Sequence, residues 1–124
     1  MNIPEHLYYT KNHEWIKIES GNAIIGITDF AQGELGDIIF VELPEEGKLF
    51  KSGETTGTIE AVKTVADIYT PIDGKVSAVN KNLENEPELI NNDPYETGWI
   101  IKFSNISKDN LEILSSSEYK KIIQ

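Results

Sequence analysis

The fold of this chain depends on the stretch Gly57-Thr-Ile-Glu-Ala-Val-Lys-Thr-Val-Ala-Asp-Ile-Tyr-Thr-Pro-Ile-Asp-Gly-Lys75. Apolar residues at Ile59 and Ala61 are typical of the end of one strand, and Val65 to Tyr69 reads as the next strand. Lys63 falls between these two runs, where a strand pair needs a turn. The stretch therefore predicts a hairpin whose tip carries one lysine outside the core.

The residues next to Lys63 in the sequence do not include groups that would activate its amine for catalysis. No histidine, cysteine or pair of acids lies close to it, and such groups are what activates a lysine amine. An amine on a rigid, projecting turn is, however, accessible to an enzyme that binds the turn and acylates the amine. The alternative is that Lys63 is one more solvated lysine, as nearly all of the eleven basic residues must be.

Length and charge limit the possible functions. The 124 residues are enough for one domain with a real core, so residues 1–124 are expected to form a single unit. The net charge of −10 argues against binding to nucleic acid or to anionic membranes, because both select basic surfaces. An acidic surface is compatible with docking onto basic patches of partner proteins.

The chain contains no cysteine, so it has neither disulfides nor thiolate metal sites, and any redox chemistry must come from an attached cofactor. Residues 1–6 show no signal or transit pattern, and no apolar run approaches membrane-spanning length. We therefore expect a cytoplasmic protein of bacterial type.

Short strands separated by glycine turns recur along the chain. The N-terminal half begins with a hairpin of strands 14–19 and 23–27, followed by a Thr28 or Asp29 cap and a short helix over 30–35 that ends at Gly36. Further strands are expected at 37–43, around 49–50, and at 55–61, 75–80 and 99–103. Pro71 to Gly74 reads as a turn, with Gly74 available for a positive φ. The region 83–90 reads as a loop or single helical turn, and 91–98 as a long turn.

The end of the chain is helical in pattern. Ser107 can cap a helix over 109–114, and Ser115 to Glu118 forms a capping box for a second helix. The apolar side of that second helix would carry Tyr119, Ile122 and Ile123. With so few apolar positions, helices in the region 107–123 should dock on the sheet. The overall pattern predicts a β-sandwich or barrel with helical additions.

Patterns of catalysis and metal binding are absent from the sequence. His6 and His13 are the only histidines, and their spacing is not that of metal ligands. No glycine-rich loop precedes a helix, and no serine lies in a nucleophile elbow. The chain has 21 acidic residues, so two carboxylates close together in the sequence would not by themselves indicate a catalytic acid–base pair. Nothing specific supports an enzyme.

Seven blocks in order resemble the H protein family of the glycine cleavage system and cover nearly the whole chain. They are residues 9–15 (YTKNHEW), 26–32 (GITDFAQ), 35–44 (LGDIIFVELP), 59–63 (IEAVK), 66–69 (ADIY), 71–76 (PIDGKV) and 89–99 (LINNDPYETGW). The resemblance implies a mainly β, lipoyl/biotinyl-type sandwich, or flattened barrel. Its core would span about 23–103, extended by an N-terminal hairpin, short helices and C-terminal helices at about 107–123.

By this resemblance, Lys63 is the lysine converted to N6-lipoyllysine, and the chain is a non-catalytic carrier. The lipoyl arm would take an aminomethyl group from the pyridoxal-phosphate-dependent glycine decarboxylase (P protein) and present it to the tetrahydrofolate-dependent aminomethyltransferase (T protein). Dihydrolipoamide dehydrogenase (L protein) would reoxidise the arm, and a lipoylating enzyme would attach it. The protein is expected to be monomeric.

The resemblance also implies a cleft that holds the arm. Its candidate residues here are Asn12, Glu14 and Asp67, and the two carboxylates suit pairing with an aminomethyl cation. Alternatively, Glu14 is a solvated carboxylate at a strand start. Asp67 is equally suited to a turn or to solubility.

The sequence departs from the family pattern close to the lysine, where the family commonly has Ser at 61, small residues at 64 and 65, and Ser at 66. This chain has Ala61, Thr64, Val65 and Ala66 there, which bears on lipoylation efficiency and on the resting place of the arm. Three alternatives remain open. A biotin carrier would usually flank the lysine with methionines, but Val62 and Thr64 stand here. The others are an H-like lipoyl relay or carrier in another pathway, and an unmodified interaction module.

Overall fold

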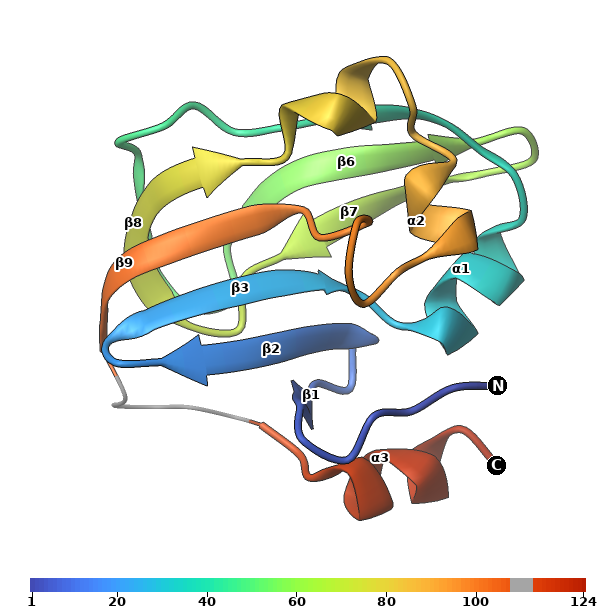
Figure 1. Cartoon of the computed structure of the whole chain (residues 1–124), viewed down its shortest axis with the longest axis horizontal. Coiled ribbons are helices and arrows are strands. Elements are labelled where there is room, and N and C mark those ends of the chain that lie inside the picture. The colour runs from blue at the N-terminus through green and yellow to red at the C-terminus, as the bar shows by residue number, and fades with distance from the viewer. Residues whose placement is uncertain (108–112) are drawn as a thin grey trace.

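A computed structural model describes residues 1–107 and 113–124 of the chain. Its strands form two antiparallel sheets, one of six strands in the order β1-β2-β3-β9-β8-β5 and one of three in the order β4-β6-β7 (Figure 1). The strand bounds are β1 Tyr8–Tyr9, β2 Glu14–Glu19, β3 Asn22–Ile27, β4 Ile38–Glu42, β5 Leu49–Phe50, β6 Thr55–Ala61, β7 Val65–Tyr69, β8 Asp73–Val79 and β9 Ile101–Ser107.

The helices are short and lie at the edges of the sheets. They are α1 Asp29–Leu35, the 3-10 turn η1 Lys81–Glu84, α2 Leu89–Asn92 and α3 Ser116–Ile122. None of the helices within the described ranges is long and apolar enough to cross a membrane.

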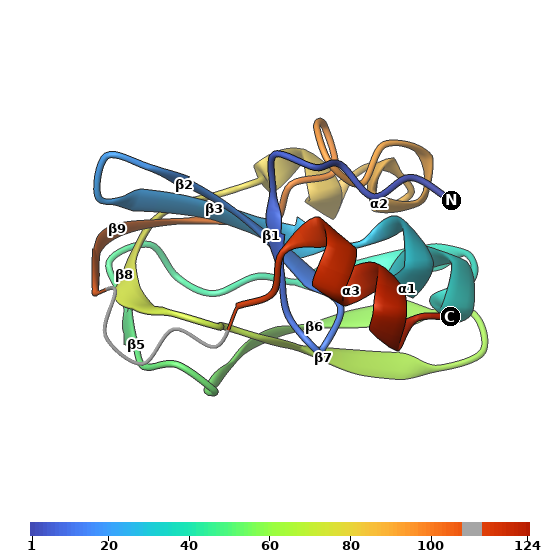
Figure 2. The same cartoon turned by 90° about the horizontal axis from the view of Figure 1, so that it is seen from below.

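The main core lies between the two sheets, which form separate layers in Figure 2. Inward positions of both sheets alternate with outward ones, as the period of a strand requires. The buried side chains that meet there include Ile16, Ile25, Ile59, Ile68, Val76 and Phe103. The prediction of a mainly β, lipoyl-type sandwich is confirmed, and the two sheets are not closed into a barrel.

A second apolar cluster joins the two ends of the chain. It consists of Leu7, Tyr9, Trp15 and Tyr119, with Trp99 and Leu114 among the residues packed around it. The rings of Tyr9 and Tyr119 stack with centroids 4.8 Å apart, and Tyr9 forms an isolated bridge with Leu114. Helix α3 therefore docks through Tyr119 against β1, at the edge of the six-stranded sheet.

The predicted caps of α1 and α3 are present. The Thr28 hydroxyl accepts a hydrogen bond from the Ala31 N–H at the start of α1, and Gly36 ends that helix with a φ of 77°. Ser115 and Glu118 form the reciprocal capping box of α3. Local hydrogen-bonding chemistry thus sets these helix ends.

Glycine at position 57 allows two strands to approach closely. Gly57 lies in β6 beside a register shift, and a Cβ added there would overlap the backbone carbonyl oxygen of Glu42 in β4. A residue without a side chain is needed for this contact.

The turn predicted from Pro71 to Gly74 ends earlier than predicted, so the predicted boundary is wrong. Strand β8 begins at Asp73, Gly74 pairs with Phe50, and Gly74 is not among the glycines with positive φ. A Cβ on Gly74 would lie 3.2 Å from the Cβ of Phe103, so the need for glycine here is steric rather than conformational.

The last strand also differs from its prediction. It begins two residues later than Trp99 and continues to Ser107, which is the last residue of β9. Most of the helix predicted over 109–114 falls on residues 108–112, outside the described residues. Part of the turn predicted over 91–98 is helical, because α2 runs to Asn92.

Candidate functional site

Lys63 lies at the tip of the β6–β7 hairpin and is exposed. The strands pair up to Glu60 and Val65, and the Ala61 N–H donates to the Thr64 carbonyl at 2.8 Å to close the turn. The hairpin projects at the right-hand end of Figure 1, near α1. The amine is therefore presented on a short turn with a strand on each side.

The base of this turn is held against the end of α1. The Val62 N–H donates to the Asp37 carbonyl at 3.0 Å. Gly36, the C-cap of α1, lies beside the lysine stem: a Cβ on Gly36 would stand 3.4 Å from Cε of Lys63. The stem of Lys63 therefore lies within van der Waals reach of the residue that ends α1.

Asn91 of α2 fixes this support. Its Oδ1 accepts from the Ile38 N–H at 3.0 Å, and its Nδ2 donates to the Gly36 carbonyl at 2.8 Å and to Gln32 Oε1 at 3.0 Å. One amide thus joins α2, the end of α1 and the start of β4. This role could not be predicted from the sequence, because Asn91 stands in a segment rich in turn-forming residues.

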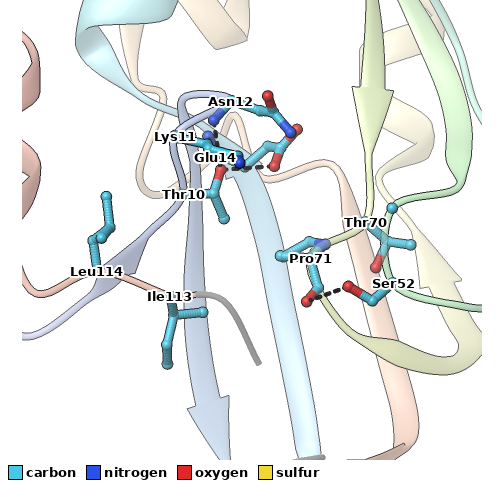
Figure 3. Close-up of a pocket in the computed structure, with 10 residues that line it drawn as sticks. Thr10, Lys11, Asn12, Glu14, Ser52, Thr70, Pro71, Ile113 and Leu114 are labelled. Atoms are coloured by element: carbon cyan, nitrogen blue, oxygen red, sulfur yellow. Dashed lines mark hydrogen bonds between the residues drawn. The ribbon is translucent and has the colours of Figure 1, made fainter. Parts of the chain in front are cut away.

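A pocket of about 250 Å³ lies near the other end of β7 (Figure 3). It is enclosed by the loop before β2, the loop after β5, the segment after β7 and the segment before α3. Its lining residues are Thr10, Lys11, Asn12, Glu14, Ser52, Gly53, Thr70, Pro71, Ile113 and Leu114.

Glu14 is the buried acid of this pocket, with 2% of its surface exposed. Its Oε1 accepts from the Thr10 hydroxyl at 2.8 Å, and its Oε2 accepts from the Tyr69 N–H at 3.2 Å. Burial raises the pKa of the Glu14 carboxyl to about 7, although these two hydrogen bonds act in the opposite direction. The alternative of a solvated carboxylate is therefore wrong for Glu14.

The structure brings together two of the three predicted cleft residues. Asn12 lines the same pocket as Glu14, and its N–H donates to the Thr10 hydroxyl at 3.2 Å. Asp67 is exposed on β7, where it pairs with Thr58 of β6. It does not belong to the described residues that line the pocket. Asp67 and Glu14 thus lie in different surroundings.

Thr10 and Thr70 are pocket residues that the sequence did not single out. Thr10 also accepts from the Glu14 N–H at 3.2 Å, so its hydroxyl fixes both the backbone and the carboxyl of Glu14. Thr70 is fully buried and donates to the Ile72 carbonyl at 2.6 Å. A threonine before Pro71 carries no local pattern that distinguishes it from a strand residue.

His13 serves the packing of the chain ends. It adopts a φ of 66°, its Nδ1 lies 2.8 Å from the Tyr119 hydroxyl, and burial lowers its pKa. The Tyr119 hydroxyl also lies 2.7 Å from the Thr28 hydroxyl. Within the described ranges, no group of three histidine and acidic side chains is arranged to hold a metal ion.

The glycine cleavage H-protein family model matches residues 7–124. A glycine cleavage system H protein of Listeria innocua is 57% identical over 122 residues, which cover 98% of each chain. One from Listeria monocytogenes serotype 4b is 53% identical over 124 residues and 99% of each chain. The crystal structure of a glycine cleavage system H protein from Mycobacterium marinum superposes with a TM-score of 0.90 at 37% identity, covering 98% of both chains.

Proposed function

The chain belongs to the glycine cleavage H-protein family, and on that premise we propose that it is a lipoyl carrier of glycine cleavage. Lipoate would be attached through an amide to Nζ of Lys63. The observation that carries this assignment is the exposed Lys63 on a hairpin tip braced by Asp37 and Gly36. The carrier would work in the cytoplasm as a monomer and catalyse no step itself.

Attachment requires an amine that an enzyme can enclose. The deprotonated Lys63 amine attacks the carbonyl carbon of an activated lipoyl donor held by the lipoylating enzyme. The amide C–N bond forms, the activating group leaves with the bonding electron pair, and the amine loses its proton. The amide is uncharged, so this change also removes one positive charge from the tip.

The attached lipoyl group supplies a disulfide on a flexible tether, able to take up an aminomethyl group from one enzyme and give it to another. The chain contributes the position of that tether. Strand β7 covers roughly 14 Å between Val65 and Tyr69 at the usual rise per residue. The hairpin therefore places the attachment point one strand length from the pocket of Glu14.

The pocket suits a cationic end group. A positive charge placed beside the Glu14 carboxyl would favour its ionised form and so lower its pKa from about 7. Thr10 and the Tyr69 N–H hold the carboxyl in position, and Asn12 supplies an amide at the rim. We propose that Glu14 and Asn12 hold the loaded arm, whereas Asp67 contributes from the outer surface of β7.

The proposed partners follow from the family. They are glycine decarboxylase as donor, aminomethyltransferase as acceptor, dihydrolipoamide dehydrogenase as oxidant and a lipoylating enzyme. A stiff hairpin limits the volume that the tether explores, which raises the concentration of its end group at each partner.

Intact-mass measurement tests the attachment site. After reaction with a lipoylating enzyme, the wild-type mass should rise by one lipoyl group, and Lys63→Arg should stay unmodified because an arginine cannot form this amide. Lys75→Arg, at an exposed position of β8, is the matched control and should be modified normally. An unchanged wild-type mass would refute the carrier assignment.

Carbon exchange between glycine and bicarbonate tests the pathway. With glycine decarboxylase, exchange should require the lipoylated protein and should be absent with Lys63→Arg. Efficient lipoylation without any exchange would instead support the relay function in another pathway.

A further inference from the structure

The hydroxyl of Tyr119 joins three parts of the chain. It lies 2.8 Å from Nδ1 of His13, in the loop before β2, and 2.7 Å from the hydroxyl of Thr28, which caps α1. Tyr119 is fully buried in α3, and a buried hydroxyl needs such partners because an unpaired one costs free energy. Helix α3 is thus tied to the loop before β2 by polar contacts as well as by packing.

The loop from Thr10 to Glu14 folds tightly around His13. The His13 N–H donates to the Thr10 carbonyl at 3.1 Å, and the Thr10 N–H donates to the Glu14 carbonyl at 3.0 Å. The His13 backbone has a φ of 66°, in the left-handed region, where a residue with a side chain stays only when its surroundings hold it. The conformation of the loop therefore depends on what His13 contacts.

Three residues hold His13 from outside the loop. Its ring lies 4.9 Å from the ring of Phe30 and 5.7 Å from the ring of Tyr119, measured between centroids. Its carbonyl accepts from the Thr28 N–H at 3.0 Å. Because Thr28 also contacts the Tyr119 hydroxyl, this hydroxyl reaches the ring of His13 directly and the backbone of His13 through Thr28.

The segment before α3 forms a wall of the Glu14 pocket. Ile113 and Leu114 line the pocket, and Leu114 exchanges two backbone hydrogen bonds with Tyr9, of 2.9 and 2.7 Å. Tyr9 directly precedes Thr10, whose hydroxyl donates to the Glu14 carboxyl. The loop is therefore held at its start by this segment and near its end by α3.

We propose that Tyr119 is a positioning residue for the pocket: its hydroxyl, through His13 and Thr28, keeps the loop closed over Glu14. Tyr119 is not one of the described residues that line the pocket, so it acts through the loop. The inference rests on the proposed role of Glu14 as the carboxylate that holds the loaded arm, and it extends that role to a residue of α3.

The hydroxyl of Tyr119 can be removed without its ring. The ring stacks on Tyr9 with an angle of 8° between the two planes, and a phenylalanine ring can stack in the same way. Both contacts of the hydroxyl, in contrast, lead to His13. Burial raises the pKa of Tyr119 to about 12, and the charge of Glu14 adds to this rise, so the two groups are close enough to interact.

Carboxyl NMR of the unmodified protein tests this role, because the Glu14 pKa reports the solvation of the pocket. Protein with isotopically labelled glutamate carboxyls is titrated, and the Glu14 signal is identified by its loss in Glu14→Gln. With the loop closed, burial keeps the Glu14 pKa at about 7. Tyr119→Phe should let water reach the carboxyl and lower its pKa by about one unit, since burial is the largest cause of the rise.

Tyr95→Phe is the matched control. The Tyr95 hydroxyl also makes two hydrogen bonds, accepting from the Asp29 N–H at 3.0 Å and donating to the Asn2 carbonyl at 2.6 Å, and both partners lie outside the loop before β2. The Glu14 pKa should stay at the wild-type value in this variant, and thermal unfolding shows that each variant is folded. An unchanged or raised Glu14 pKa in Tyr119→Phe, or an equal fall in Tyr95→Phe, would overturn the positioning role.

His13→Asn separates positioning from backbone strain. Asparagine tolerates a positive φ better than other residues with a side chain, but it is too short to replace the ring nitrogen that faces Tyr119. The variant should therefore keep the turn and still lower the Glu14 pKa, as Tyr119→Phe does. A wild-type Glu14 pKa would show that the loop stays closed without the contact to Tyr119, which contradicts the proposal.

The titration is independent of the test of the carrier function, because it uses the chain before lipoylation. An unchanged Glu14 pKa in Tyr119→Phe, together with normal lipoylation of wild-type Lys63, would overturn the positioning role alone. Failure of wild-type lipoylation would instead refute the carrier function, and a lowered Glu14 pKa would still link Tyr119 to the pocket.

Discussion

At the scale of single residues, the molecule has two acids with opposite surroundings. Glu14 is buried and held by Thr10 and Tyr69, whereas Asp67 stands in solvent. The loop before β2 folds back so that one threonine hydroxyl serves both the backbone and the side chain of Glu14. Burial, rather than any neighbouring charge, is the largest cause of its raised pKa.

Glu14→Gln should change how stability depends on pH. The Glu14 pKa is about 7 in the folded protein and ordinarily 4.5, so between these values the folded state binds more protons than the unfolded state. Wild-type stability therefore loses about 3 kcal/mol through Glu14 as pH rises across this window. The variant lacks this loss, so its stability relative to wild type should increase by that amount from pH 4 to pH 8.

Urea unfolding of the unmodified protein at several pH values measures this difference. Subtracting wild type from variant removes the contributions of other groups, such as the Asp29 and Glu118 carboxyls, whose pKa values are lowered by hydrogen bonds. Glu19→Gln, which removes an exposed carboxylate, is the matched control, and the difference for Glu14→Gln should exceed the difference for Glu19→Gln. A flat difference for Glu14→Gln would contradict the raised pKa.

At the scale of elements, the ends of helices depend on individual side chains. Helix α3 has only seven residues, and isolated helices of this length are not stable in water. The capping box at Ser115 and the stacking of Tyr119 on Tyr9 supply the missing stability.

Ser115→Ala should loosen α3. It removes the hydroxyl that accepts from the Glu118 N–H, and loss of such a cap costs about 1 kcal/mol. Amide hydrogen exchange within the helix should therefore accelerate about fivefold at constant pH, because opening becomes easier by that free energy. Ser116→Ala, one residue further on, keeps the cap and should exchange as wild type; equal rates in both variants would contradict the role of Ser115.

The same elements show what the sequence could predict. Alternation of apolar residues located β2, β3 and β6, and cap residues located α1 and α3, because these signals depend on local chemistry. The end of β9 and the start of β8 were misplaced. Their pairing, Asp73 with Ser107, joins residues far apart in sequence and has no local signal.

The features of the candidate site likewise fall into those that local sequence predicts and those that depend on contacts between distant residues. The position of Lys63 on a turn followed from the strands beside it. The burial of Glu14 depends on residues 52–53 and 69–71 meeting the loop before β2, and the support from Asn91 depends on α2 lying beside Gly36. These contacts exist only once the sheets have packed.

At the scale of the whole molecule, the two apolar clusters are connected through the strands of the six-stranded sheet. The core between the sheets contains Phe50 and Phe103, while both tryptophans, Trp15 and Trp99, belong to the cluster that joins the chain ends. Trp15 nevertheless lies on β2, directly next to the buried Ile16 of the main core.

Because the clusters meet at β2, residues 1–124 should unfold as one cooperative unit. Tryptophan fluorescence reports the cluster at the chain ends, and far-UV circular dichroism reports the backbone as a whole. Urea transitions followed by the two signals should coincide. Gly26→Ala, whose Cβ would meet the Trp15 ring at 2.6 Å, should shift both midpoints down together. Two separate midpoints in wild type would reveal two domains.

Gly57 sets a limit on how this protein can evolve. Its backbone lies against the Glu42 carbonyl so closely that any mutation adding a side chain must push β4 and β6 apart, and β6 leads directly to the turn of Lys63. A substitution at this position would therefore impair folding and would also displace the turn that carries Lys63. We therefore expect selection to hold position 57 fixed while exposed positions such as Glu46 drift among descendants.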